Sequence, residues 1–198
     1  MSCAVGWNTR NSSCTVNGVG DIPVLKTERL RLRPWIEADR ALFAEMNSDP
    51  RVMEHFPSLL SRRESDALMD RIVDGWRQGY GLWAVERREN AGFIGFLGFS
   101  QPRWEAHFTP CIEIGWRLAA SSWNQGLATE AAWAALSWGR ENVAFPRNEV
   151  VSFTTSANAP SRRVMEKVGM THDPADDFDH PLLPEWVGRR HVLCRLAL

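Results

Sequence analysis

Residues 111–131 read "CIEIGWRLAASSWNQGLATEA", and this stretch decides the fold. Its first part, "CIEIGWRL", is an apolar run that predicts a strand, and a turn holding one glycine, Gly126, leads from there into an alanine-rich helix. A second strand-like run, "NEVVSFTT" at residues 148–155, follows that helix. The intervening segment of about 30 residues has the size of a βαβ crossover. We therefore predict that these two strands are parallel.

Further segments carry strand signals. "RLRLRPW" at residues 29–35 alternates charged and apolar side chains, the period of a half-buried strand, until its proline interrupts the ladder. "GLWAVERR" (81–88) and "FIGFLGFS" (93–100) are joined through "ENAG", whose Asn and Gly fit a hairpin turn. "RRHVLCRLAL" at residues 189–198 predicts a last strand. Early hairpins and a later crossover indicate a mixed sheet.

Helical spacing occurs between the strands. "IEADRALFAEMN" at residues 36–47 is followed by the Asp-Pro pair of "SDPRV", and residues 61–81 begin with Ser61 and Glu64 in the spacing of a capping box. A short helix is predicted in "SANAPSRRVMEKVGM", residues 156–170. The whole pattern predicts an α/β (α+β) fold: a mixed, mostly antiparallel twisted sheet of six to seven strands, flanked by about four helices.

Chain length fits one medium domain. The 198 residues, 44% of them hydrophobic, supply one core, and we assign residues 25–198 to a single domain. Residues 1–24 lack the basic start and leucine-rich stretch of a secretory signal and are predicted to form a mobile tail. Because no run of about 18 apolar residues occurs, no transmembrane helix is predicted.

Charge and cysteine content limit the partners. Lys plus Arg at 23 nearly cancel Asp plus Glu at 24, so neither nucleic acid nor a membrane surface is expected as a partner. The four cysteines follow no zinc or disulfide spacing, which favours free thiols in the cytoplasm. In "DDFDHP" (176–181), His180 lies beside carboxylates, yet the spacing matches no ligand pattern, and no metal is predicted.

The turn at Gly126 has the properties of an anion site. A strand, a short turn and a helix aim the first unpaired N–H groups of the helix, and its positive dipole end, at a ligand. The Lys-Ser/Thr pair of a nucleotide-hydrolysing P-loop is missing. A phosphate here would therefore serve as a handle and not as the reacting centre. The alternative is an ordinary structural turn.

The order of "CIEIGWRL", "WNQGLATEA", a helix, "NEVVSFTT" and "NAPSRRVMEKVGM" resembles the GNAT superfamily of acyl-CoA-dependent N-acetyltransferases. The RimJ/RimL-type branch, whose members acetylate the amino termini of ribosomal proteins, looks closest. The resemblance extends from about Leu25 to Leu198. It implies the GNAT fold, in which a splayed pair of parallel strands forms the cofactor cleft, and acetyl-CoA as the acyl donor.

The resemblance also implies where acetyl-CoA binds. The pyrophosphate would lie on backbone N–H groups of the loop, and the residues matching N-x-x-S would lie along the pantetheine arm, with simple helix capping as the alternative for them. The implied cofactor contacts are Trp116, Arg117, Leu118, Asn124, Gln125, Gly126, Leu127, Ala128, Thr129, Asn158 and Ser161. A backbone N–H near Arg117 falls where relatives polarise the thioester carbonyl.

Glu113 is the predicted catalytic base. It is a carboxylate within an otherwise buried-looking strand, and it stands where many GNAT enzymes draw a general base. The alternative is a structural salt bridge or hydrogen bond. Much of the superfamily uses a tyrosine to protonate the leaving thiolate, but Met165 stands at that position, so Ser161 or a water is the remaining candidate.

These observations predict a cytoplasmic N-acetyltransferase that moves an acetyl group from acetyl-CoA directly to a primary amine, most simply the α-amine of a protein or peptide. The alternatives are acetylation of a small amine, such as a polyamine, amino acid or antibiotic, and a non-catalytic acyl-CoA-binding regulator. A monomer or a homodimer is expected.

Overall fold

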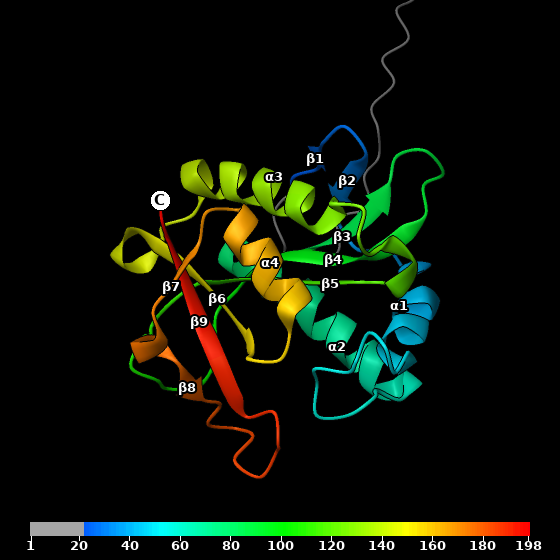
Figure 1. Cartoon of the computed structure of the whole chain (residues 1–198). Helices are drawn as coiled ribbons and strands as arrows, with labels where there is room; N and C mark the ends of the chain where they lie inside the picture. The colour runs from blue at the N-terminus through cyan, green and yellow to red at the C-terminus, as the bar shows by residue number, and fades with distance from the viewer. Residues whose placement is uncertain (1–21) are drawn as a thin grey trace, which may run out of the picture.

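The chain folds around one mixed sheet. The computed structural model describes residues 22–198, in which the strand order is β1-β2-β3-β4-β5-β6-β9-β7, with β8 paired to β9 (Figure 1). Every neighbouring pair is antiparallel except β5 and β6, which are parallel as predicted. The strands are β1 (Leu25–Lys26), β2 (Leu30–Arg33), β3 (Leu82–Arg87), β4 (Phe93–Ser100), β5 (Glu113–Leu118), β6 (Glu149–Thr155), β7 (Thr171–His172), β8 (Phe178–Asp179) and β9 (Arg190–Ala197).

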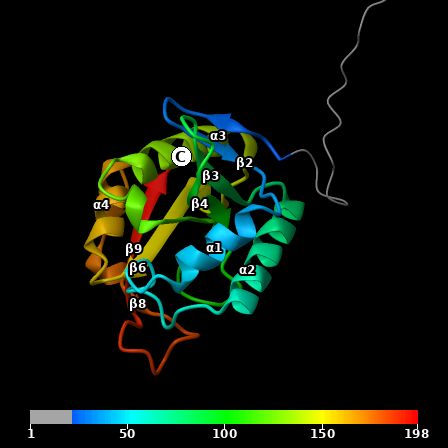
Figure 2. The same ribbon diagram turned by 90° about the vertical axis from the view of Figure 1, so that its right-hand side faces the viewer.

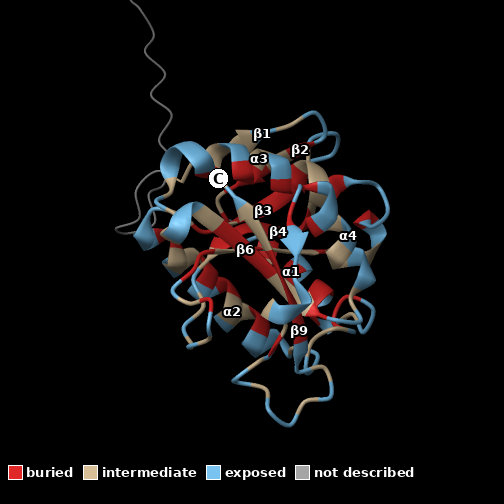
Figure 3. Ribbon diagram, turned by 60° about the vertical axis from the view of Figure 1, so that its left-hand side comes forward, coloured by how far each residue is buried: buried red, intermediate tan, exposed pale blue. Residues whose placement is uncertain are grey.

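Four α-helices cover the two faces of the sheet. They are α1 (Asp39–Ser48), α2 (Arg62–Gly75), α3 (Leu127–Asn142) and α4 (Ala159–Lys167). Helices α1 and α2 lie side by side on one face, which we call the α1/α2 face, where Phe43 and Met69 belong to one cluster with Phe96 of β4 (Figure 2). Helix α3 packs on the opposite face, the α3 face. Buried residues concentrate between these layers (Figure 3).

The alternation of side chains along β5 assigns its residues to the two faces. Ile114 and Leu118 are buried in the core under α3, and Trp116 packs against them. Glu113 and Arg117 therefore point to the α1/α2 face, as the period of a strand requires.

The element boundaries confirm most of the sequence prediction. All six predicted strands and all four predicted helices are present, and Ser61 and Glu64 form the capping box at the start of α2. Helix α2 ends at Gly75, and residues 76–78 continue as a 3₁₀ turn. The additional strands β1, β7 and β8 have two residues each, too short for a periodic signal in the sequence.

The predicted N-terminal tail falls mainly outside the described residues, as do Cys3 and Cys14. Cys111 and Cys194 are buried free thiols. Within residues 22–198, no helix is both long enough and apolar enough to cross a membrane.

Candidate active site

Strands β5 and β6 separate after a single paired position. Their register aligns Glu113 with Val151, whose N–H donates to the Ile112 carbonyl at 3.0 Å. Beyond this point β5 stays paired with β4 as far as Leu118, and β6 stays paired with β9 as far as Thr155. Because no further β5–β6 pair follows in the described residues, the two strands separate beyond Glu113 and Val151. Their facing edges form a wedge-shaped opening, which we call the splay.

Strand geometry decides which backbone groups face the splay. The N–H of Ala119 donates to a carbonyl of β4 at 2.8 Å, and backbone groups point alternately to the two sides along a strand. The N–H of Arg117 therefore belongs to the β4 ladder, where the register shows no bulge. The N–H groups of Trp116 and Leu118 face the splay instead. The donor predicted near Arg117 thus corresponds to these two neighbours.

The N-terminus of α3 follows the wide end of the splay. Its N-cap residue, Gly126, has a φ of 76°, a left-handed conformation that favours glycine, and no side chain caps the helix. The first bond of the helix runs from the Glu130 N–H to the Gly126 carbonyl at 3.0 Å. The N–H groups of Leu127, Ala128 and Thr129 precede that bond, so they are open to an anion.

Two arginines hold this loop from outside. Arg29 donates to the Gln125 carbonyl at 2.8 Å and pairs with Glu130 at 2.6 Å, while Arg87 donates to the Gln125 side-chain oxygen at 2.6 Å. Because a trans peptide points its C=O and N–H in opposite directions, anchoring the Gln125 carbonyl turns the N–H of Gly126 away from Arg29. The arginines thus fix the direction of the loop. No local sequence signal identifies them, because Arg29 lies 96 residues from its partner.

Asn158 caps α4, the alternative that the sequence left open. Its side-chain oxygen accepts from the Ser161 N–H at 3.2 Å, and its amide donates to the Thr154 hydroxyl at 2.9 Å. The Ser161 side chain is partly exposed on the first turn of the helix. Met165, at the position of the tyrosine in many relatives, is buried in the core under α3.

Glu113 lies at the narrow end of the splay. Its side chain is partly buried, and one carboxylate oxygen accepts from the Ser100 hydroxyl at 3.3 Å. No Lys, Arg or His within residues 22–198 pairs with it, so of the two structural alternatives the hydrogen bond to a neighbouring strand is present and the salt bridge is not. Burial raises its pKa to about 7, against the opposing effect of the Ser100 hydrogen bond. A carboxyl group with this pKa is half ionised at neutral pH, where a general base is most useful.

The family is identified by sequence comparison. The family described as "Acetyltransferase (GNAT) domain" matches residues 29–171. The chain belongs to the GNAT acetyltransferase family. The match spans the splay, the loop at Gly126 and Glu113, and it confirms the prediction of an acetyltransferase with the GNAT fold.

Relatives agree with this assignment. The uncharacterised protein YkkB of Bacillus subtilis (strain 168) is 33% identical over 153 residues, covering 74% of this chain and 84% of YkkB. The uncharacterised N-acetyltransferase YoaA of the same organism is 28% identical over 154 residues, covering 74% and 82%. Mycobacterium smegmatis RimJ in complex with CoA-disulfide has the same fold, with a TM-score of 0.66, 18% identity and coverage of 84% and 81%.

GNAT acetyltransferases use acetyl-CoA, and the donors present suit its phosphates. The first turn of α3 lacks a side-chain cap and offers N–H groups at the positive end of a helix. A side chain at Gly126 would find only Arg29 within 4 Å, so the approach to the loop is otherwise open. These features fit an anion held by backbone groups.

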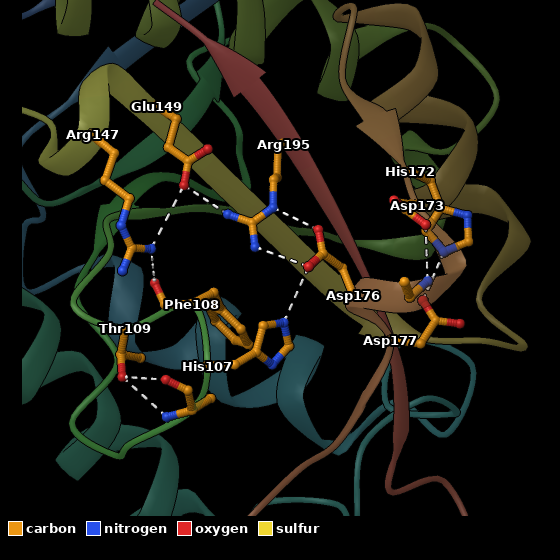
Figure 4. Close-up of polar contacts among 12 residues, drawn as sticks. His107, Phe108, Thr109, Arg147, Glu149, His172, Asp173, Asp176, Asp177 and Arg195 are labelled. Atoms are coloured by element: carbon orange, nitrogen blue, oxygen red, sulfur yellow. Dashed lines mark hydrogen bonds and ion pairs between the residues drawn. The ribbon is translucent and has the colours of Figure 1, made fainter.

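The acidic segment near residue 176 has a structural role in this GNAT acetyltransferase. Asp176 pairs with Arg195 at 2.7 Å and with His107 at 3.2 Å, and Arg195 also pairs with Glu149 at 2.7 Å (Figure 4). The network ties the segment before β8 to β9 and β6. Within residues 22–198, no group of three His, Cys, Asp or Glu side chains could hold a metal ion.

The side chain of Arg117 is a site feature that the sequence reasoning missed. On the α1/α2 face it donates to the Asn47 side-chain oxygen at 2.6 Å, and its guanidinium lies 4.0 Å from the ring centroid of Phe56. Ser100, the partner of Glu113, was also missed. Period-2 alternation places Arg117 on the face of Glu113, but contacts with a distant helix and loop leave no local signal.

The raised pKa of Glu113 predicts how stability depends on pH. A carboxyl group whose pKa is higher in the folded state stabilises the fold below its ordinary value of 4.5, and this contribution is lost as the pH rises through about 7. We expect Glu113→Gln to have a Tm close to that of the wild type at pH 5 and about 5–10 °C higher at pH 8.5. Thermal unfolding at both pH values measures this. The exposed Glu45→Gln is the control, and an equal Tm difference at both pH values would contradict the raised pKa.

Proposed function

We propose that this GNAT acetyltransferase moves the acetyl group of acetyl-CoA to a primary amine, namely the N-terminal α-amine of a protein or peptide, in the cytoplasm. The observation that carries the proposal is the splay, which has the uncapped α3 N-terminus at its wide end and Glu113 at its narrow end. A solved structure of the same fold is described as RimL, a ribosomal L7/L12 alpha-N-protein acetyltransferase, and this likeness of fold motivates an N-terminal acceptor.

The cofactor contacts follow from this arrangement. Bound acetyl-CoA supplies an acetyl thioester. The backbone N–H groups of residues 125–129 bind its pyrophosphate, those of Trp116 and Leu118 face its acyl arm, and Asn158 and Ser161 begin the helix beside it. Residue Asn124, with a φ of 59°, turns the chain into this loop.

Glu113 removes the proton that the amine must lose. At pH 7 an α-amine with a pKa of about 8 is neutral roughly one time in ten, whereas a lysine amine with a pKa of about 10.4 is neutral under one time in a thousand. A carboxylate with a pKa of about 7 is therefore better matched to an α-amine. Ser161 or a water returns a proton to the thiolate.

Transfer is direct, without a cysteine intermediate. Cys111 is the thiol nearest to Glu113 along the chain, but it is buried in an apolar cluster. Burial and the Glu113 charge raise the pKa of its thiol to about 11. A thiol that stays protonated at neutral pH is a poor nucleophile.

Calorimetry followed by an acceptor assay tests the proposed function. We expect acetyl-CoA to bind with a micromolar Kd, while NAD and ATP, the phosphate-bearing controls, do not bind. The assay then offers two peptides, one with a free α-amine and one with a blocked α-amine and a free lysine. We expect acetylation of the first alone. Absence of acetyl-CoA binding would refute the cofactor site, and acetylation of lysine alone would refute the acceptor.

A further inference from the structure

Arg117 is a largely buried cation without a counter-ion. Within residues 22–198, its only side-chain hydrogen bond is to Asn47, its Nε is buried without a partner, and no carboxylate lies within ion-pair distance of it. Burial lowers its pKa to about 10, so the guanidinium stays charged at neutral pH. Burying a charge without a partner costs folding free energy, so its presence here points to a function.

The same protein shows how a buried arginine is ordinarily satisfied. Arg33 is 6% exposed and contacts two carboxylates, Asp39 at 2.7 Å and Glu86 at 2.6 Å. Arg117 has instead a neutral amide and the ring of Phe56. Asn47 is itself fixed, because it is fully buried and donates to Ser65 at 2.9 Å. The guanidinium is therefore held in place, while some of its N–H donors remain available to a ligand.

The side chains of Glu113 and Arg117 lie on the same face of β5, and the surface between them is open. Gly115 lies between them on the α1/α2 face, and a Cβ added there would meet only the Glu113 carboxylate, at 3.5 Å. The four residue steps from Glu113 to Arg117 span about 13 Å along a strand. An amine at Glu113 and an anionic group at Arg117 would complement two charges that have no ionic partner among residues 22–198.

The neighbouring pocket carries the same sign of charge as Arg117. A pocket of about 540 Å³ includes Ser100, the partner of Glu113, in its lining. Arg71 and Arg103 also line it, and no Asp or Glu does. A polyamine would meet repulsion there, whereas an acceptor with a negative charge would be attracted.

We infer that the acceptor is a primary amine that also carries a carboxylate, and that Arg117 binds this carboxylate while Glu113 faces the amine. The inference rests on the proposed function and narrows its acceptor. The carboxylate belongs to an acidic residue near the N-terminus of a peptide, because the amine and carboxylate of a free α-amino acid are too close together to reach both side chains. Guanidinium and carboxylate form paired, directional hydrogen bonds, so Arg117 sets specificity as well as affinity.

Matched acceptors test this inference. The first pair is alanine and alaninamide, and the second is the dipeptide amides Ala-Glu-NH₂ and Ala-Gln-NH₂. We expect the wild type to have a kcat/KM at least 10-fold higher for Ala-Glu-NH₂ than for Ala-Gln-NH₂. An acid preference in the alanine pair alone would overturn the inference. Arg117→Gln should remove the preference mainly through KM. Arg140→Gln, which removes an exposed arginine at the end of α3, should keep it.

A binding measurement separates this inference from the proposed function. Calorimetry with acetyl-Ala-Glu-NH₂ and acetyl-Ala-Gln-NH₂, and with acetylalanine and its amide, reports a carboxylate site without turnover. Tighter binding of the acid member that is abolished in Arg117→Gln supports the site. If the glutamine variant does not fold, Arg117→Lys replaces it, and the loss of the paired guanidinium hydrogen bonds should weaken binding of the acid member. Transfer to amines with no preference in either pair overturns the inference and leaves the proposed function intact. The inference is also overturned if Arg117→Gln keeps the kcat/KM preference for the acid acceptor, or if only Arg103→Gln loses it.

Discussion

Gly126→Glu should weaken acetyl-CoA binding at least 100-fold. Gly126 has a φ of 76°, which costs an L-residue about 1–2 kcal/mol, and the new carboxylate would stand at the uncapped N-terminus of α3. There it would satisfy the N–H groups and the helix dipole that we assign to the pyrophosphate, and it would repel the phosphates directly. The added Cβ would lie 3.6 Å from Arg29, an ordinary contact, so the fold should persist. Calorimetry with acetyl-CoA measures the loss.

Gly169→Glu is the matched control for this variant. Gly169 also has a left-handed backbone, with a φ of 88°, is exposed after α4, and would place its Cβ 3.8 Å from Leu196. The two variants therefore carry similar backbone strain and the same added charge. If both bound acetyl-CoA with the affinity of the wild type, the phosphate site would have to lie elsewhere.

Local patterns in the sequence were sufficient to predict the fold. Each long strand has a recognisable run, and the helical crossover between residues 111 and 155 indicates the parallel pair, because parallel strands need a connection of this length. The capping box of α2 follows from two residues three positions apart. These features depend on neighbours along the chain, which a sequence displays directly.

The supporting contacts of the site could not be predicted in the same way. Arg29 reaches Gln125, Asn47 reaches Arg117, and Ser100 reaches Glu113 only because the sheet and helices bring distant segments together. The assignment of a backbone donor near Arg117 needed the register of β4 and β5, since a shift of one residue reverses which N–H faces the splay. Pairing between strands, not periodicity within one, decides such details.

Glu113→Gln should lower kcat/KM about 100-fold at pH 7. Glutamine keeps the shape of the side chain and can still accept a hydrogen bond from Ser100, but it cannot take a proton, and general-base catalysis contributes about 10²–10⁴-fold. The wild-type kcat/KM should rise with pH through an inflection near 7, the pKa of Glu113. This inflection should be missing in the variant. The remaining rise should follow the amine itself, near pH 8 for an α-amine, and the loss should shrink at high pH.

Ser100→Ala distinguishes a catalytic Glu113 from a structural one. The Ser100 hydrogen bond favours the ionised carboxyl group and opposes the effect of burial. Removing it should therefore move the inflection of the pH profile to higher pH, while the rate at high pH stays close to that of the wild type. A carboxyl group that only stabilised the fold would change Tm in both variants without moving this inflection. A profile identical in the wild type, Glu113→Gln and Ser100→Ala would remove Glu113 from the role of base.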